Sequence, residues 1–280
     1  MKWLGEGYSR YGMLFLIILL ILPFSALGEL KVHIIDVGQG DAILVQCDRQ
    51  NLLIDAGPVE AGKVVNDYLT NKAGIAQLDY VIATHEHDDH LAGMPDALYD
   101  LTVQKIYSGT GIPLSYWFKT VLPKVQGNTF SVVRPTQGES VELGEATVTF
   151  FDRMTNAENA NDLCIIVRID YGQNSILLMA DMEGEGEQFL LEQQTQLKAD
   201  ILKIGHHGGN TSTSEQFLKA VNPKIAIISV GTDNKHGHPH KEIINRLEKY
   251  NVTVYRTDVF GTIILTSNGT EWTVEVSKVG

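Results

Sequence analysis

A run of metal-binding side chains at residues 84–90 constrains this chain more than any other segment. The run reads Thr-His-Glu-His-Asp-Asp-His and follows the apolar stretch 78–83. Three imidazoles and a carboxylate behind a buried strand would be costly to desolvate without a cation, and ordinary loops draw on Gly, Asn, Ser and Pro. His85 and His87 can face one metal while Asp89 and His90, entering a helix, face a second. The segment therefore predicts a two-metal centre at a strand-to-helix turn.

The spacing within this run also excludes one common metalloprotease arrangement. A zincin helix needs His-Glu-x-x-His, but position 89 is Asp. Glu86 is therefore not expected to act as the general base of such a motif.

Alternating strand and helix patterns continue through the rest of the chain. Two halves, each passing from strands into strand-helix units, fit two packed sheets flanked by helices better than one wound parallel sheet. We therefore predict an α/β fold, a four-layer αββα sandwich over residues 29–280. The middle of the chain, 104–152, mixes strand-like pieces with one helix, and its apolar periodicity is the weakest. The predicted strands are 30–37, 42–46, 51–54, 78–83, 165–169, 175–180, 200–204, 224–230, 252–257, 262–266 and 271–276, and the predicted helices are 61–73, 91–99, 113–125, 183–194, 214–221 and 240–250.

The N-terminus has the pattern of a secretory signal peptide. Residues 13–22 are an unbroken apolar run after Lys2 and Arg10, and small residues follow at 25–28. An uncleaved membrane anchor through 13–27 is the alternative, although a span needs about 20 apolar residues. Both readings predict a secreted or extracytoplasmic protein, anchored to the membrane if residues 1–28 are retained.

The charge balance limits the partners of the mature chain. Loss of Lys2, Arg10 and Glu6 from totals of 22 basic and 34 acidic residues leaves 20 and 33, a net charge of −13. A surface this acidic argues against broad, sequence-independent binding of nucleic acid through its phosphates. It does not exclude a phosphate substrate, because bound cations can reverse the field inside a site.

The two cysteines, Cys47 and Cys164, both lie in apolar, strand-like runs. Small buried core residues are the favoured interpretation, and a disulfide stays open because spacing cannot decide it.

Several motifs together resemble one superfamily. The pattern His-x-His-x-Asp-His after a buried strand is similar to the hallmark of the metallo-β-lactamase superfamily. The other motifs resemble its branch with the C-terminal domain of ComEC-type DNA-uptake proteins, which also includes secreted relatives and a bacterial phosphorylcholine esterase. They follow in order over nearly the whole of 29–280, as Ile-Asp-Val-Gly-Gln-Gly-Asp-Ala at 35–42, Leu-Ile-Asp-Ala-Gly at 53–57, Leu-Met-Ala-Asp at 178–181, Leu-Lys-Ile-Gly-His-His-Gly at 202–208 and Gly-His-Pro at 237–239.

The resemblance implies a ligand set. It makes Asp181 the carboxylate that bridges both metals, although Asp181 could also cap the helix at 183–194. Many members supply a histidine between the first cluster and this Asp, but none occurs here from 91 to 205. The simplest way to complete the ligand set places His206 beside His85 and His87 on one metal. His238 then joins Asp89 and His90 on the other. The predicted metal ligands are His85, His87, Asp89, His90, Asp181, His206 and His238.

Other residues receive supporting roles. His207 could protonate a leaving group, bind substrate phosphate or orient a ligand, and we group it with Asp89 and Asp181 as catalytic. Asp55 matches an Asp that orients ligand histidines by hydrogen bonds. Asp36 and Asp41 either border the pocket or cap a turn. His236 and His240 flank His238 and could replace it, and His33 fits a core or surface role. The Ser that usually follows His-His-Gly in this branch is absent, because position 209 is Gly. The hydroxyl of Thr211 or Ser212 could take its role.

A metal-dependent hydrolase is the function these features predict. No serine or cysteine nucleophile with its base is evident, so water activated by two divalent metals is expected, with zinc favoured and manganese admissible. The resemblance favours a DNA-directed nuclease. The acidic surface favours a small phosphodiester, such as a phosphorylcholine ester, or a lactone. A secreted metal- or DNA-binding protein without catalysis is the alternative of another class.

Overall fold

The computed structural model describes residues 28–151, 157, 159–193 and 196–278. The predicted signal peptide or anchor lies outside the described residues, apart from Gly28. Cleavage, anchoring and localisation therefore stay predictions. No helix of the described ranges is long and apolar enough to cross a membrane.

Two mixed sheets form the centre of the molecule. The first has eight strands, in the order β15 (Trp272–Val276), β14 (Ile263–Ser267), β1 (Leu30–Ile34), β2 (Ile43–Cys47), β3 (Gln50–Ile54), β4 (Gln77–Ala83), β5 (Thr102–Ser108) and β6 (Ser131–Val133). The second has seven, in the order β13 (Thr253–Arg256), β12 (Ile225–Ile228), β11 (Ile201–Lys203), β10 (Asn174–Leu178), β9 (Ile166–Tyr171), β8 (Ala146–Phe151) and β7 (Ser140–Leu143).

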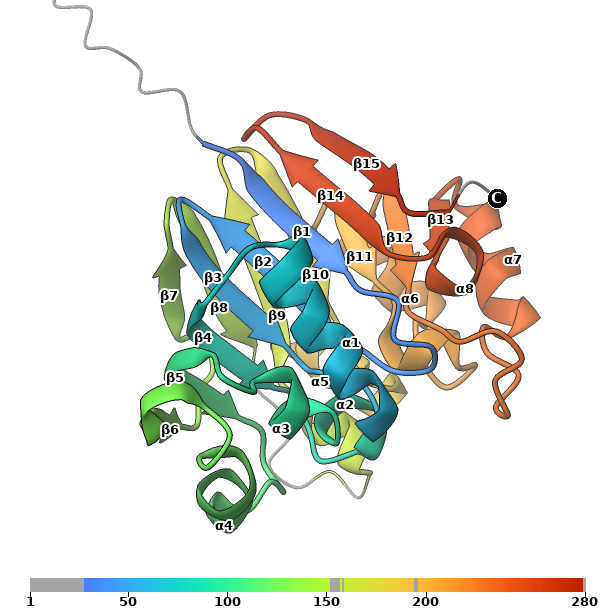
Figure 1. Ribbon diagram of the computed structural model, residues 1–280. Coiled ribbons are helices and arrows are strands. Elements are labelled where there is room, and N and C mark those ends of the chain that lie inside the picture. Colours follow the sequence, from blue (N-terminus) through green and yellow to red (C-terminus); the bar gives the residue numbers. More distant parts are fainter. Residues whose placement is uncertain (1–27, 152–156, 158, 194–195, 279–280) are drawn as a thin grey trace, which may run out of the picture.

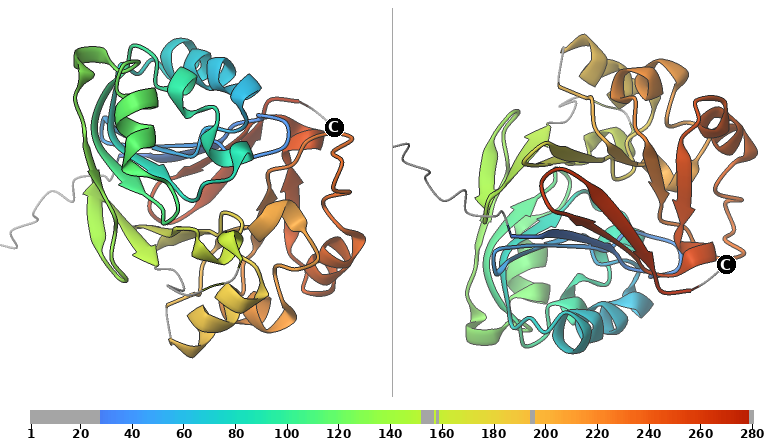
Figure 2. Two further views of the ribbon diagram at one scale, coloured as in Figure 1. Left: turned by 90° about the horizontal axis from the view of Figure 1, so that it is seen from below. Right: turned by 90° about the horizontal axis from the view of Figure 1, so that it is seen from above.

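Helices cover the outer face of each sheet, which confirms the predicted αββα sandwich (Figures 1 and 2). The first sheet is covered by α1 (Gly62–Asp67) with its π-helical continuation Tyr68–Lys72, α2 (Asp88–Leu91), α3 (Met94–Ala97) and α4 (Leu114–Tyr116), which continues as the π-helix Trp117–Val121. The second is covered by α5 (Gly184–Glu192), α6 (Glu215–Val221) and α7 (Lys241–Lys249), while α8 (Thr257–Phe260) follows β13.

Alternating side chains explain why the sheets stack. In β1, Leu30, Val32 and Ile34 point into the core between the sheets. In β2, Val45 faces that core while Leu44 packs under the helices of the other face. Both faces of each central strand are thus buried, which is typical of sheets covered by helices.

The sheet topology also positions the site. Strands β3, β4 and β5 run parallel in the first sheet, and β10, β11 and β12 run parallel in the second. Asp55, His85, Asp181 and His206 lie just beyond the carboxyl ends of β3, β4, β10 and β11. The polar segments of both sheets therefore meet at one edge of the sandwich, where ligands commonly bind in α/β folds.

Two predicted helices are interrupted. The helix predicted over 91–99 is split into α2 and α3 around Gly93, whose N–H donates to the Gly57 carbonyl at 2.9 Å. A Cβ on Gly93 would lie 2.2 Å from the Ala56 carbonyl oxygen, so the close approach requires glycine. In the weakly periodic middle, the predicted helix at 113–125 is α4 with a π-turn, and the strand-like pieces predicted there without bounds are β5 to β8.

The two cysteines lie in the core, as predicted. Cys47 and Cys164 are both free and buried, one between the sheets and one under the helices of the second sheet.

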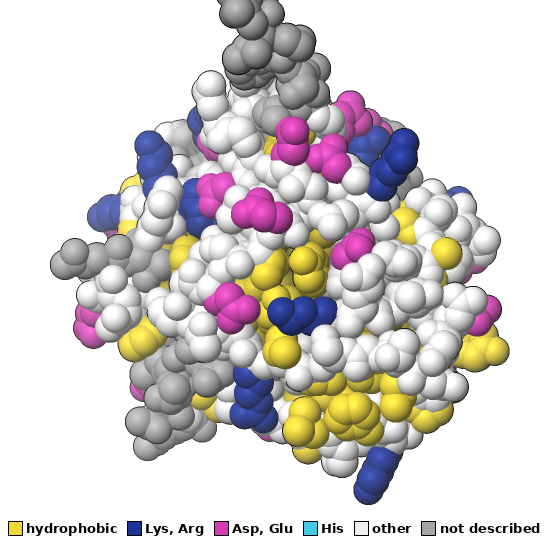
Figure 3. Space-filling view, turned by 90° about the vertical axis from the view of Figure 1, so that its left-hand side faces the viewer, with side chains coloured by type: hydrophobic (Ala, Val, Ile, Leu, Met, Phe, Trp, Pro, Cys, Tyr) yellow, Lys and Arg dark blue, Asp and Glu magenta, His cyan; other side chains and the backbone are white. Residues whose placement is uncertain are grey.

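Figure 3 shows the face of the molecule that lies on the left-hand side of Figure 1. On it, basic side chains stand singly among acidic and apolar ones. That face offers no broad basic stripe to a nucleic acid backbone.

Candidate metal centre

Two donor groups share the carboxylate of Asp181. The first group joins His85, His87 and Asp181, and the second joins Asp89, His90, Asp181 and His207. Within each group the donor atoms lie within 4.8 Å of one another. The residues come from the segments after β4, β10 and β11, so both sheets contribute to one site.

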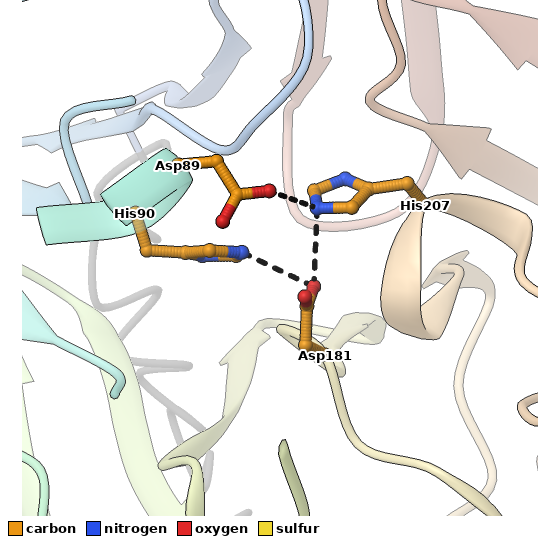
Figure 4. A group of neighbouring side chains, drawn as sticks. All are labelled: Asp89, His90, Asp181 and His207. Atoms are coloured by element: carbon orange, nitrogen blue, oxygen red, sulfur yellow. Dashed lines mark ion pairs between the residues drawn. The ribbon is translucent and has the colours of Figure 1, made fainter. Parts of the chain in front are cut away.

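Close distances mark the second group (Figure 4). Asp181 Oδ1 lies 3.2 Å from His90 Nε2 and 3.3 Å from His207 Nε2, and Asp89 Oδ2 lies 3.3 Å from His207 Nε2. Ligand atoms about 2.0–2.1 Å from a tetrahedral zinc are separated by about 3.3–3.4 Å. The observed spacing therefore fits a shared cation.

The other oxygen of Asp181 faces the first group. Its Oδ2 lies 3.9 Å from His85 Nε2, and His85 Nε2 lies 3.1 Å from His87 Nδ1. One carboxylate thus presents a different oxygen to each set of histidines. This is the arrangement of a bridging ligand.

Hydrogen bonds aim the imidazoles at the centre. His90 Nδ1 donates to Asp55 Oδ2 at 2.8 Å, and His207 Nδ1 donates to the Ser229 carbonyl at 2.9 Å. Each bond leaves the Nε2 lone pair free for a metal. Asp55 also accepts the backbone N–H of Thr84 at 2.8 Å and its hydroxyl at 2.6 Å, which anchors the start of the His85 segment.

Buried atoms without hydrogen bonds test whether these residues fit a metal. His90 Nε2, His207 Nε2 and Asp181 Oδ1 are buried and lack a hydrogen-bond partner, although they approach one another closely. Unpaired buried polar atoms are costly. Three such atoms converging on one point fit a divalent cation.

Electrostatics favour positive charge at this centre. Burial alone would raise the pKa of Asp181, but the neighbouring His207 and His90 hold it well below its usual range. Burial alone would lower the pKa of His90, but the Asp181 and Asp55 carboxylates raise it well above its usual range. For His85, burial and the neighbouring His90 lower the pKa. The carboxylates thus stabilise a cation among them.

Asp41 borders the centre, as one of its two predicted roles required, and pairs with Lys203, which the sequence did not indicate. Lys203 is fully buried, pairs with Asp41 and donates to the Ala180 carbonyl at 3.2 Å, just before Asp181. Asp41 also lies 3.9 Å from His90 Nδ1. Asp36 instead accepts the Gly38 N–H at 3.2 Å and pairs with Lys278 at 2.8 Å, so it fits the turn-capping alternative.

The placement of His206 and His238 differs from the predicted pairing. His206 Nδ1 lies 3.0 Å from Glu183 Oε1, and neither His206 nor His238 joins a donor group of the described residues. His207 takes the buried position because His206 and His207 both adopt left-handed backbone angles after β11, with φ of 48° and 52°. The tight turn directs His207 to the centre and leaves His206 at the rim.

The rim bears further histidines around an open cleft of about 540 Å³. His238 lines the cleft, with its ring centre 5.2 Å from that of His206. Burial and the neighbouring imidazoles, His206 first, lower the pKa of His238 to about 4. His236 lines the cleft too, whereas His240 accepts the Asn210 N–H and His33 contacts the Tyr68 hydroxyl far from the cleft.

Ser212 is structural rather than exposed to substrate. Its buried hydroxyl donates to the Gly205 and Gly209 carbonyls, bracing the turn that carries His207. The hydroxyl of Thr211 lies 3.3 Å from His206 Nδ1.

A larger hollow, of about 750 Å³, lies at the amino ends of the second sheet's parallel strands. Arg168, Lys198 and Tyr250 are among its lining residues. It contains none of the donor groups, so the smaller cleft is the candidate site.

An αββα sandwich with a carboxylate shared between two histidine groups fits the class of metal-dependent hydrolases. The chain belongs to the metallo-beta-lactamase superfamily, whose family model matches residues 35–232. This shows the predicted superfamily and supports a metal-dependent hydrolase.

Curated relatives place the chain near competence proteins. It is 32% identical over 266 residues to ComE operon protein 3 of Bacillus subtilis, covering 88% of this chain and 34% of that protein. It is 31% identical over 255 residues to Recombination protein 2 of Haemophilus influenzae, covering 87% and 30%. The chain therefore spans about a third of the length of these relatives. These similarities are consistent with the predicted ComEC-like branch.

Solved structures show the same fold at low identity. The metallo-beta-lactamase fold protein YhfI from Bacillus subtilis superimposes with a TM-score of 0.57 at 17% identity, over 85% of this chain and 99% of that one. The metallo hydrolase Igni18 from Ignicoccus hospitalis gives 0.53 at 16% identity, over 89% and 100%.

Proposed function

We propose that this chain is a two-metal phosphodiesterase that acts on DNA. The observation that carries the proposal is Asp181, whose two oxygens face different histidine groups at the base of an open cleft. We propose His85, His87 and Asp181 as ligands of one metal, and Asp89, His90, Asp181 and His207 as ligands of the other. Zinc suits this thiolate-free set, and manganese is admissible.

The residues of the cleft have distinct roles in the proposed reaction. Divalent metals bound here would activate water and neutralise charge developing on the phosphate. Asp181 and Asp89 hold the centre together, while Asp55 fixes the orientation of His90. Lys235 and His238 line the same cleft, where a cationic group and an imidazole can contact a phosphate or its leaving group.

DNA is favoured among phosphodiesters by the relatives. One of them is named as a recombination protein, and a further relative, Competence protein ComA of Neisseria gonorrhoeae, is 29% identical over 239 residues and covers 84% of this chain. Against this, the net charge of −12 offers little general attraction for a polyanion. A small phosphodiester is therefore the second candidate, and a non-catalytic metal- or DNA-binding protein is the third.

One hydrolysis panel separates these candidates. The full chain, supplied with zinc or manganese, is compared on plasmid, single-stranded DNA, RNA, a generic phosphodiester, a phosphorylcholine ester and a lactone. We expect DNA cleavage that falls at least about 100-fold in His87→Ala, since loss of a metal ligand should exceed the effect of losing its supporting hydrogen bonds. Cleavage retained in that variant would point to a contaminant, and selective hydrolysis of a small ester would overturn the DNA assignment.

A further inference from the structure

The donor group around His85 and His87 is smaller than its neighbour. Among the His, Cys, Asp and Glu side chains of the described ranges, it has three members, including the shared Asp181, whereas the second group has four. One more protein ligand would give this group the same number as its neighbour, and with a water it would make a five-coordinate metal.

Asn161 is a neutral polar residue of the same cleft. It belongs to the short 3-10 helix Ala160–Leu163 and lines the cleft together with His87 and Asp181. Its side-chain Oδ1 is buried and has no hydrogen-bond partner, and the whole residue is only 6% exposed. An unpaired buried amide oxygen in a polar cleft calls for a positive or hydrogen-donating partner.

The orientation of this amide is fixed by Glu183. Asn161 Nδ2 donates to Glu183 Oε1 at 2.7 Å. Because a carboxylate accepts and does not donate, the nitrogen must face Glu183 and the oxygen must face away from it. Glu183 is itself paired with His206, so that histidine supports the amide indirectly.

The segment carrying Asn161 is tied to both ligand segments. Asp162 accepts the backbone N–H groups of Glu183 at 2.9 Å and Gly186 at 3.1 Å, which anchors it next to Asp181. The Ile165 N–H donates to the Thr84 carbonyl at 3.0 Å, which anchors it next to His85. Asn161 is thus held between the His85–His87 segment and Asp181.

We propose that Asn161 Oδ1 is a further ligand of the metal held by His85 and His87. The inference rests on the metal centre of the proposed function and deepens it. A neutral amide oxygen is a harder donor than imidazole, so it suits manganese or magnesium better than a third histidine would. The position therefore sets the metal preference of this half of the centre.

The test compares metal binding by the full chain and three variants, with stoichiometry from native mass spectrometry and affinity from competitive titration with zinc and manganese. Asn161→Ala should lose one of two metals or bind it at least about tenfold more weakly. Asn161→His should keep two metals, bind zinc more tightly relative to manganese, and change the visible absorption of the cobalt-substituted chain. Asn159→Ala is the matched control, because Asn159 caps the same 3-10 helix by accepting the Asn161 N–H at 3.1 Å.

Two results from the variants would overturn the assignment. One is a metal count and affinities in Asn161→Ala equal to those of the wild type. The other is an equal loss in Asn159→Ala, which would show that the segment acts only by its position. A wild-type chain that binds two metals and loses one in Asn161→Ala, yet cleaves no DNA, would uphold the assignment and overturn the proposed function. A wild-type chain that binds no metal would overturn both.

Discussion

At the residue scale, the two adjacent histidines after β11 have different environments. His207 is 1% exposed and lies 3.3 Å from both Asp89 and Asp181, while the side chain of His206 is 27% exposed and pairs with Glu183. A one-residue shift along the chain thus separates a donor at the centre from a residue at the rim.

Substitution of the two histidines should therefore have unequal effects. His207→Ala should weaken one metal by at least about 100-fold because it removes a donor, whereas His206→Ala should cost less than about tenfold because it removes only indirect support. Metal titration of the two purified variants checks this order. Equal or reversed losses would favour His206 as the ligand.

The sequence predicted the chemistry of this site better than its geometry. The segments that form the site could be found from two patterns. One is the high density of His and Asp at 85–90, and the other is the apolar strands that end at Asp181 and at His206–His207. Which of two neighbouring histidines points inward depends on left-handed backbone angles at 206 and 207, which side-chain patterns do not encode. The role proposed for Asn161 was not anticipated, because a single Asn in a loop normally signals a turn.

At the element scale, the junction between α2 and α3 holds the ligand helix against the β3 loop. Gly93 N donates to the Gly57 carbonyl and Ala56 N donates to the His90 carbonyl, both within 2.9 Å. The helix predicted for 91–99 is therefore interrupted at Gly93. Three backbone carbonyls surround this position, and only glycine leaves space for them.

A methyl group at this junction should therefore disturb both stability and metal binding. Gly93→Ala would place a Cβ 2.2 Å from the Ala56 oxygen and is expected to destabilise the fold by about 1–3 kcal/mol. Gly184→Ala is the control, since its Cβ would meet its nearest neighbour, the Thr211 carbonyl oxygen, at an ordinary 3.4 Å. Urea unfolding of both variants measures the difference, and an equal stability would contradict the packing.

The long, strongly patterned elements were predictable, and the short ones were not. Strands β1 to β4 and β9 to β15, apart from shifts of one to three residues at their ends, follow apolar patterns that the sequence displays. Strands β5 to β8 lie in the weakly periodic middle, where strand-like pieces were evident but their bounds were not, although Ser140–Leu143 and Ala146–Phe151 alternate in burial. Tertiary pairing, rather than local preference, places them in the sheets.

At the scale of the whole molecule, a buried carboxylate links stability to pH. Glu187 on α5 is 1% exposed and accepts the N–H groups of Thr213 and Ser214, at the start of the turn before α6. Burial raises the pKa of Glu187 to about 7, although these N–H groups and the nearby Arg246 oppose the shift.

Stability should consequently fall as this group ionises. The pKa of Glu187 in the folded chain lies above its ordinary value of 4.5, so its contribution to the free energy of unfolding is complete below about pH 4.5 and is lost as pH rises through about 7. Glu187→Gln cannot ionise, and its stability relative to wild type should rise by about 2.5 kcal/mol between pH 5 and pH 8. Urea unfolding at both pH values measures this, with the exposed Glu185→Gln as control. A pH-independent difference for Glu187→Gln would contradict the account.

The αββα sandwich matters to the proposed function because both of its sheets supply donor residues to one cleft, four after β4 of the first sheet and two after β10 and β11 of the second. Anomalous diffraction from crystals of the zinc-loaded chain tests this claim most directly. We predict two peaks on opposite sides of Asp181, one beside His85 and His87 and the other among Asp89, His90 and His207. A single peak, or a peak between His206 and His238 instead, would contradict the proposed centre.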